Sequence, residues 1–535
     1  MKNLLFLVTA SIALTACNQG NQKSSSVAMP LYDSTYAPAA FADAARADKI
    51  KGSFAIIDSL YRKYAVENHL PGISFGLVVD GQLVYKNSYG YTDVEKKIPA
   101  TTSSLFRIAS MSKSFTCMAL LKLRDEGKLN LDDPAYLYIP ELKTLKYPTA
   151  DAPVITIRHL MSHSAGFPED NPWGDRQLAD TDKDLLDFIG KQISFSNPPG
   201  IAYEYSNLGF ALQGKIITKV AGMRYQDYIR QNILEPLGMK TTTYEFGDVV
   251  PEKLAHGYRW LNEKWNEETL LHDTRDGSWG AMGSMISSID EFAAYMALHL
   301  SAWPPNNSKE TGPIKRSSVR EMQHPWRWNG FISDYKFPDG RTCAVTSAYC
   351  YGLGWMVDCD GKKYIAHSGG LPGFGSQWRI MPDYGIGVVA FANRTYAPMG
   401  AINLRILDTL VKIAALQPRQ LAPSKFLEQR KNELVNLLPA WTNAEQSGLF
   451  AENFFPDNPI DSLKKQATAL YEKAGKIIAV KELKPENQLR GKFVLEGEKT
   501  DIEVYFTLSP ENPPLIQEYH MKELPKTLLN QETPK

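Results

Sequence analysis

The sequence is poor in cysteine and has no excess of charge of either sign. Five of its 535 residues are cysteine, and 59 Lys and Arg balance 59 Asp and Glu, which gives a formal net charge of zero. A neutral chain produces no overall field that would draw it onto nucleic acid or an anionic lipid surface. Hydrophobic residues make up 43% of the chain, enough for more than one apolar core, so a chain disordered throughout is excluded.

Four of the five cysteines lie well inside the chain. Cys117 falls on the apolar face of a predicted helix, which favours a place in the core. Cys343, Cys350 and Cys359 do not have the spacing of zinc ligands. In an oxidising compartment we expect one disulfide among these three, and the sequence leaves the pairing open.

The first residues have the pattern of an export signal. Lys2 precedes an apolar run too short to span a bilayer comfortably, and the segment LTAC, which ends at Cys17, resembles a bacterial lipobox. That resemblance implies removal of residues 1–16, lipidation of Cys17 and a polar tether over residues 17–49. We therefore expect an exported lipoprotein, anchored to a membrane and located in the periplasm or at the outer surface. A soluble secreted protein is the alternative.

Hydrophobic periodicity predicts an α+β domain over residues 50–417. A helical pattern over 50–66 precedes two strands joined by a tight turn at Asp80-Gly81, and strands at 362–370, 374–382 and 385–395 precede a final helix. The long stretch between these two groups is mainly helical. The order predicts a sheet with an inserted all-α lobe and a pocket at the seam between them.

The pattern changes after about residue 418. Two amphipathic helical segments are followed by four short strand patterns. A block of this size, with its own helices and strands, predicts a small accessory α+β domain over residues 418–535. It contains no cluster of catalytic residue types.

Ser110 and Lys113 stand three residues apart at the start of a predicted apolar helix. On a helix the two side chains lie one turn apart on the same face, so the lysine amine can reach the serine hydroxyl. Burial and nearby cations would lower the pKa of the lysine, and the helix N-terminus would stabilise an oxyanion. The alternative is an ordinary helix start with a solvated lysine, because Ser-x-x-Lys alone is a common spacing.

Two further segments favour the catalytic interpretation. YSN at 205–207 precedes another apolar helix, and HSGG at 367–370 ends a short strand. With Ser110 and Lys113, they resemble the Ser-x-x-Lys, Tyr-x-Asn and Lys/His-x-Gly signatures of the penicillin-binding-protein and serine β-lactamase superfamily, in its class C-like branch. The resemblance spans about residues 50–415. It implies a β-lactamase/DD-peptidase-like fold, an antiparallel sheet flanked by terminal helices.

The resemblance implies a role for each matching residue. Ser110 would be the acylated nucleophile, Lys113 its proton partner, and Tyr205 the group that passes a proton to or from the leaving group; whether lysine or tyrosine is the acylation base stays open. Asn207 would hold a substrate amide carbonyl, and backbone N–H groups of Ser110 and Gly370 would form the oxyanion hole. His367 would face the substrate from an edge strand. The substrate-binding residues implied in this way are Asn207, His367, Ser368, Gly369 and Gly370.

His367 departs from the lysine that many members of the superfamily carry at this position. A histidine is only partly charged at neutral pH, so it attracts a substrate carboxylate less than lysine does. We therefore expect slow β-lactam hydrolysis. If the imidazolium binds a carboxylate, kcat/KM falls as the pH rises through a histidine pKa of about 6.5.

Other motifs are interpreted as structural. The pattern GISFG at 72–76 matches the Gly-x-Ser-x-Gly motif but lies where a strand enters a hairpin. His159 and His163 have the spacing of a zinc helix without the glutamate or a third ligand, and are interpreted as local hydrogen-bonding groups. Ser288 has the sequence context of a helix cap.

Together these features predict a serine hydrolase that acts through an acyl-enzyme without metal or other cofactor. The leading substrate class is a D-amino-acid-containing peptide, cleaved as by a DD-carboxypeptidase or D-aminopeptidase and derived from peptidoglycan. The alternatives are an esterase or β-lactamase of the same fold, and a non-catalytic binding or scaffold protein. The expected partners are this substrate and, through Cys17, a membrane, with no nucleic acid.

Overall fold

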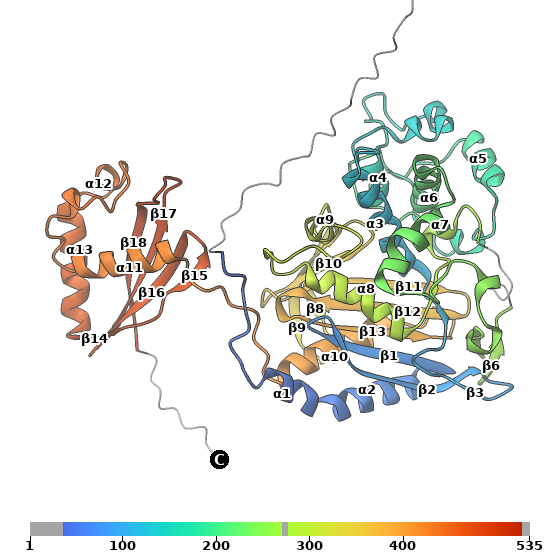
Figure 1. The fold of residues 1–535 in the computed structure, drawn as a ribbon, viewed down its shortest axis with the longest axis horizontal. Helices are drawn as coiled ribbons and strands as arrows, with labels where there is room; N and C mark the ends of the chain where they lie inside the picture. Colours follow the sequence, from blue (N-terminus) through green and yellow to red (C-terminus); the bar gives the residue numbers. More distant parts are fainter. Residues whose placement is uncertain (1–35, 270–275, 527–535) are drawn as a thin grey trace, which may run out of the picture. The chain divides into compact units, whose positions relative to one another are not determined.

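A nine-stranded antiparallel sheet is the main element of the computed structural model, which describes residues 36–269 and 276–526 (Figure 1). The strand order is β3-β2-β1-β13-β12-β11-β10-β9-β8, and neighbouring strands run antiparallel. The expected α+β class with an antiparallel sheet is therefore confirmed. The strands are β1 Gly72–Val79, β2 Gln82–Asp93, β3 Ile98–Pro99, β8 Arg327–Lys336, β9 Thr342–Tyr349, β10 Gly354–Asp358, β11 Lys363–Leu371, β12 Phe374–Met381 and β13 Ile386–Ala392.

Helices cover both faces of this sheet. The terminal helices α2 (Phe54–Glu67) and α10 (Met399–Ile413) pack on one face and share an apolar core with it. Helix α8 (Ile289–Ser301) packs on the other face, in a core that also contains α3 (Ser112–Asp125) and α6 (Asn207–Ala221). Because β1 and β13 are covered on both faces, they are buried along their whole length, and this explains their continuous apolar sequences.

The segment between β3 and β8 forms the inserted, mainly helical lobe (Figure 1). It contains α3, α6 and several short helices, with two small two-stranded sheets, β4 with β7 and β5 with β6. The remaining elements of this region and of the N-terminal side are α1 Arg46–Gly52, α4 Ile157–Met161, α5 Asp182–Gly190, α7 Tyr225–Ile229, α9 Arg316–Met322, β4 Phe106–Arg107, β5 Tyr258–Leu261, β6 Lys264–Glu267 and β7 Ile286–Ser287.

Strand β11, which carries His367, is not an edge strand, and the expectation that it is one was wrong. Strands β10, β9 and β8 extend the sheet beyond it. However, β10 pairs only with the first half of β11, from Lys363 to Ala366. The second half, which contains His367–Gly370, therefore has no strand partner on that side. The backbone edge of β11 is therefore unpaired on the β10 side at residues 367–370, although the strand as a whole lies inside the sheet.

The sequence did not determine which two cysteines form the disulfide, and the structure pairs Cys343 with Cys359. The bridge links the start of β9 to the turn that follows β10. Cys350 and Cys117 are buried free thiols, and Cys117 lies in the core as expected.

Residues after 420 form their own apolar core beside a five-stranded sheet. The elements are α11 Lys425–Leu437, α12 Phe454–Asp457, α13 Ile460–Ala474, β14 Ile477–Val480, β15 Lys484–Asn487, β16 Arg490–Gly497, β17 Asp501–Leu508 and β18 Ile516–Leu524.

Short segments before residue 50 and after residue 417 bond to the main domain. Helix α1 begins before residue 50, and Arg46 is buried against Asp80 and the carbonyl of Tyr384. At the other end, Gln420 forms a backbone bridge with Ala40. Residues 40–49 and 418–420 therefore belong to the main domain, because they bond to its sheet-flanking segments.

Cys17 and the predicted signal lie outside the described residues. Across residues 36–269 and 276–526, every helix is either too short or too polar to cross a membrane.

Candidate active site

Ser110 lies in a short 3-10 turn, Ala109–Met111, that leads directly into α3. It therefore lies two residues before the first residue of α3, while Lys113 is the second residue of that helix. Ala109 has a φ of +51°, a left-handed conformation that side chains other than glycine adopt at a cost of about 1–3 kcal/mol. Such local strain is typical of turns that hold a functional group in a fixed direction.

Lys113 is completely buried, and its amine has three polar neighbours. Nζ lies 3.0 Å from Ser110 Oγ, 2.6 Å from Asn207 Oδ1 and 2.8 Å from the carbonyl oxygen of Met282. The last two atoms only accept hydrogen bonds. A neutral amine would donate its two N–H groups to them and direct its lone pair at the Ser110 hydroxyl. This arrangement suits a base that accepts the proton of Ser110.

The charge state of Lys113 fits that geometry. Desolvation lowers the pKa of Lys113 to about 7, although the carboxylates of Asp170 and Asp175 act in the opposite direction. Near neutral pH a large share of the enzyme therefore carries the uncharged amine that a general base requires.

Tyr205 lines the cavity beside Lys113, with the amine 4.9 Å from the centre of its ring. Burial raises the pKa of Tyr205 well above its usual value, and the neighbouring Ser110 hydroxyl offsets part of the rise. Tyr205 is therefore a phenol at neutral pH and a donor of protons. Of the two candidate bases that the sequence left open, the electrostatics favour Lys113.

Asn207 orients Lys113 and does not line the cavity. It is the first residue of α6 and is fully buried, and its Nδ2 donates to Asn171 Oδ1 at 2.7 Å. Asp170 accepts the backbone N–H groups of Asn207 and Leu208 at 2.6 and 2.8 Å, which satisfies the N-terminus of the helix. Asn171, which the sequence motifs do not reveal, lines the cavity in its place.

His163 packs behind Tyr205, with ring centres 4.2 Å apart. Its Nδ1 accepts the backbone N–H of Ser206 at 3.0 Å, while His159 Nδ1 accepts that of Thr156. Both histidines are local hydrogen-bonding groups, as interpreted from the sequence. His163 also fixes the position of the tyrosine ring.

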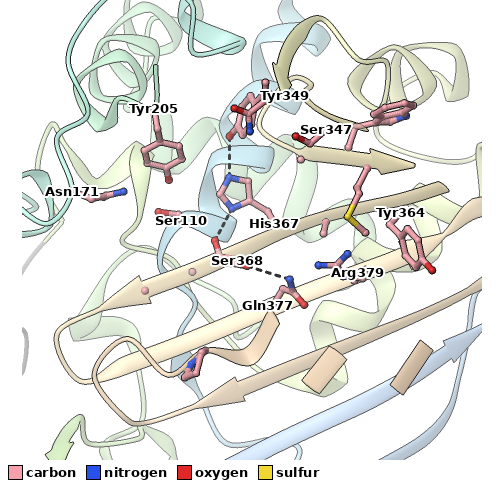
Figure 2. Close-up of a pocket in the computed structure, with 18 of the residues that line it drawn as sticks. Ser110, Asn171, Tyr205, Ser347, Tyr349, Tyr364, His367, Ser368, Gln377 and Arg379 are labelled. Atoms are coloured by element: carbon pink, nitrogen blue, oxygen red, sulfur yellow. Dashed lines mark hydrogen bonds between the residues drawn. The ribbon is translucent and has the colours of Figure 1, made fainter. Parts of the chain in front are cut away.

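His367 uses both of its ring nitrogens within the protein (Figure 2). Nδ1 lies 2.6 Å from the carbonyl oxygen of Ser368, which only accepts, so Nδ1 carries the proton. Nε2 then accepts from the Tyr349 hydroxyl at 2.9 Å. Burial, reinforced by nearby Lys113, lowers the pKa of His367 to about 3.

His367 is consequently neutral across the physiological range, and it has no free N–H for a ligand. The fall of kcat/KM through a pKa of about 6.5, expected if an imidazolium binds the substrate, does not follow from this site. The sequence did not reveal that Tyr349 is the hydrogen-bond partner of His367. Tyr349 follows small and polar residues in β9, and this pattern does not indicate a residue of the cavity.

Gly369 allows β11 to approach the turn that carries Ser110. A Cβ at this position would lie 2.2 Å from the carbonyl oxygen of Ile108 and 3.0 Å from Ala109 Cβ. Gly370, which lines the cavity, would place a Cβ 2.9 Å from the ring of Tyr396. The glycines thus bring the unpaired edge of β11 next to the nucleophile, where an extended peptide can align along it.

These groups meet in a cavity of about 590 Å³ (Figure 2). This volume is in the range of small-molecule and peptide sites. Its walls come from the nucleophile turn, the loops before α6, strands β8 to β12 and the segment after β13. The structure therefore brings Ser110, Tyr205, His367, Ser368, Gly369 and Gly370 to one cavity, with Lys113 and Asn207 directly behind it.

Comparisons with known proteins agree with this arrangement. Protein flp of Staphylococcus aureus (strain MW2) is 29% identical over 349 residues, which cover 64% of this chain and 64% of that protein. Penicillin-binding protein 4* of Bacillus subtilis (strain 168) is 27% identical over 331 residues, which cover 59% of this chain and 66% of that protein. The chain thus matches just under two thirds of the length of these relatives.

Solved structures show the same fold. The octameric penicillin-binding protein homologue from Pyrococcus abyssi has a TM-score of 0.55 at 22% identity, covering 89% of this chain and 91% of that one. The penicillin-binding protein from Bacillus halodurans has a TM-score of 0.52 at 22% identity, covering 65% and 98%. A family model described as Beta-lactamase matches residues 57–411, which is more than half of the chain and contains the whole cavity. The chain therefore belongs to the Beta-lactamase family.

Proposed function

We propose that the protein hydrolyses D-amino-acid-containing peptides through an acyl-enzyme on Ser110. The observation that carries the proposal is the buried amine of Lys113, 3.0 Å from Ser110 Oγ, with its two other contacts made to pure acceptors. A solvated lysine at an ordinary helix start would show neither the burial nor the lowered pKa.

Acylation would begin with transfer of the Ser110 proton to Lys113 as Oγ attacks the scissile carbonyl. Backbone N–H groups of Ser110 and Gly370 would receive the oxyanion. Tyr205 would give its proton to the leaving amine and recover one from Lys113, which returns the base to its neutral form. Attack of water on the ester, with its proton taken by the same pair, would release the acid and restore Ser110.

The backbone edge beside the nucleophile supports a peptide as substrate. Residues His367–Gly370 of β11 lack a strand partner on the β10 side, and an extended peptide can hydrogen-bond along such an edge. The neutral His367 provides no cation for the carboxylate of a β-lactam. An esterase or a β-lactamase with this fold is the second candidate, because the acyl-enzyme chemistry would be the same. A non-catalytic binding protein is disfavoured by the intact proton path.

Intact-mass measurement would test the proposal. The wild-type protein is exposed separately to a fluorescent penicillin, a fluorophosphonate and peptidoglycan fragments, and Ser110→Ala serves as the control. We expect a covalent adduct with the fluorophosphonate, and release of products from the fragments, in the wild type alone. An absence of adducts and of turnover on all three probes would favour the binding protein. Efficient turnover of the penicillin without peptide cleavage would favour the β-lactamase.

We also propose that the protein is exported and held at a membrane by a lipid on Cys17. The support is the sequence pattern alone, because Cys17 lies outside the described residues. The small α+β domain after residue 420 would be an accessory part that takes no share in the chemistry, since it has its own core.

A further inference from the structure

One carboxylate lines the cavity and has no role in the chemistry above. Asp175 lies in the short 3-10 turn Gly174–Arg176, and only 2% of its surface is exposed. It is the single acidic side chain among the described residues that line the cavity. Burial raises the pKa of Asp175, and the Tyr396 hydroxyl offsets part of the rise. Taking a carboxylate out of water is costly unless a cation or several donors compensate it.

The partners of Asp175 compensate this burial only in part. Oδ2 accepts from the Tyr396 hydroxyl at 2.9 Å, and within residues 36–269 and 276–526 this is the one hydrogen bond that the carboxylate receives. Lys113 and Arg176 favour its ionised form from a longer range, since neither forms an ion pair with it. By contrast, Asp170 of the same segment accepts two backbone N–H groups at the N-terminus of α6. Asp175 therefore keeps one oxygen for a further donor.

Close contacts on two sides place Asp175 at the Gly370 end of the β11 motif. On the sheet side, its partner Tyr396 packs on Gly370, where a Cβ would lie 2.9 Å from the tyrosine ring. On the lobe side, a Cβ at Gly174 would lie 2.9 Å from Asn207 Nδ2. Since Asn207 also contacts the amine of the base, the carboxylate lies close to the nucleophile.

The proton donor for the leaving group lies toward the other end of the motif. The ring of Tyr205 packs on His163, and His163 packs on Tyr349, with ring centres 4.2 and 4.4 Å apart. Tyr349 in turn bonds to His367. Figure 2 shows Tyr205 between Asn171 and His367 in the view. The leaving amine, which takes its proton from Tyr205, therefore lies on the His367 side, and the acyl part that stays on the nucleophile extends toward the buried carboxylate.

We propose that Asp175 binds a primary ammonium group on the acyl part of the substrate. Such a group donates up to three hydrogen bonds, and its charge offsets the cost of the buried carboxylate. The inference rests on the proposed function and narrows it to peptides whose acyl part carries a free amine. That amine is either the α-ammonium of an N-terminal D-residue, as in an aminopeptidase, or the side-chain ammonium of a diamino acid. A role limited to holding Tyr396 would need only a neutral acceptor.

Calorimetry on Ser110→Ala protein tests this subsite without turnover. D-alanine p-nitroanilide is compared with propionyl p-nitroanilide, which lacks only the α-ammonium. Nα-acetyl-D-lysine p-nitroanilide is compared with its norleucine analogue, which lacks only the side-chain ammonium. We expect the ammonium ligand of one pair to bind about 10- to 100-fold more tightly than its partner, the range of a charge-assisted hydrogen bond. The pair that shows the preference identifies the source of the amine.

Four substitutions in the Ser110→Ala protein separate the charge of Asp175 from its hydrogen bond. Asp175→Asn should remove the preference, and Tyr396→Lys should also remove it by supplying an internal ammonium group. Tyr396→Phe, which deletes the hydroxyl and leaves the carboxylate, should keep it. Asp151→Asn changes an exposed aspartate in a turn and should keep it as well.

An indirect effect through Lys113 would act in the opposite direction. The Asp175 carboxylate raises the pKa of Lys113, so Asp175→Asn makes this amine less often charged. A less cationic Lys113 repels an ammonium ligand less, which would strengthen the preference. A loss of preference therefore reports direct binding by Asp175.

The outcomes also separate the subsite from the reaction. Equal binding within both pairs, binding of no ligand, or a preference that survives both Asp175→Asn and Tyr396→Lys would overturn the proposal. Thermal unfolding shows that each variant is folded before binding is measured, and either of the two substitutions suffices if the other fails to fold. If the wild-type protein releases no p-nitroaniline and forms no adduct while the ammonium preference is present, the proposed hydrolysis is wrong and the cation subsite stands.

Discussion

Substitution of Asn207 by aspartate tests whether Lys113 is the base. Asn207 Oδ1 lies 2.6 Å from Nζ, and the substitution replaces a neutral acceptor with a carboxylate at nearly the same place. An opposite charge at such a distance raises the pKa of a lysine by about 1–3 units. Since the starting pKa of Lys113 is about 7, the substitution moves its titration to about 8–10.

The expected consequence is that the part of the pH profile in which kcat/KM rises moves to higher pH. In the wild type kcat/KM should rise with pH through about 7 and then level off, because only the neutral amine accepts a proton. A shift of about two units leaves roughly 1% of the enzyme with a neutral amine at pH 7, in place of about half. The activity of Asn207→Asp at pH 7 should therefore fall about 50-fold and recover in part as the pH rises.

Steady-state kinetics from pH 5 to 10 on one peptide or ester substrate measures this shift. Asn262→Asp places the same charge in the exposed turn between β5 and β6, and it should not change the pH at which kcat/KM rises. A wild-type profile that is flat between pH 5 and 8 would refute the assignment. So would an Asn207→Asp enzyme that is slower by the same factor at every pH, since this would indicate distortion of the site alone.

Four further predictions concern the nucleophile, the N-terminal cysteine, the C-terminal domain and His367. Ser110→Ala should lower turnover about a thousandfold or more and abolish labelling while the melting temperature stays near that of the wild type; wild-type turnover in this variant would contradict the catalytic interpretation. Cys17→Ala should abolish incorporation of a labelled fatty acid and release the protein from the membrane fraction, whereas a wild-type protein found entirely in the soluble fraction would contradict the anchor. A chain that ends after Gln420 should stay folded and active, because the later residues have a core of their own; a folded but inactive truncate would show that the accessory domain supports the site. Because burial lowers the pKa of His367 to about 3 while the unfolded value is about 6.5, the unfolded state binds the extra proton between these values. Stability should fall as the pH drops through that window, by up to about 1.4 kcal/mol per pH unit, and urea titration of His367→Gln should show a smaller loss.

Residues whose roles depend on local geometry were predictable from the sequence. Ser110 and Lys113 meet because three residues make about one turn at the start of α3. Strand β13 reads as a strand because its residues form a short, nearly continuous apolar run. Strand β8 was missed because it is the edge of the sheet and is exposed on both faces, so its hydrophobic residues do not alternate. A turn signal, Pro338-Asp339-Gly340, was present between β8 and β9.

Residues that contribute through tertiary contacts were not predictable. Asn171, Tyr349 and Arg379 reach the cavity from a loop and two strands that are far apart in the sequence, and no spacing links them. The size of the pKa shift of His367 could not be predicted for the same reason. Its reference pKa describes a solvated imidazole, whereas burial and Lys113 determine the actual one.

The electrostatics of the nucleophile depend on groups that also build the lobe. Asp170 stabilises the N-terminus of α6 by accepting two backbone N–H groups, and its charge opposes the lowering of the Lys113 pKa. If a second lysine occupied position 367, its charge would lower the pKa of Lys113 further, because like charges disfavour one another. The neutral imidazole avoids this, so the pKa of Lys113 follows from burial balanced by nearby carboxylates. A neutral residue at position 367 is therefore compatible with a lysine base that works near pH 7.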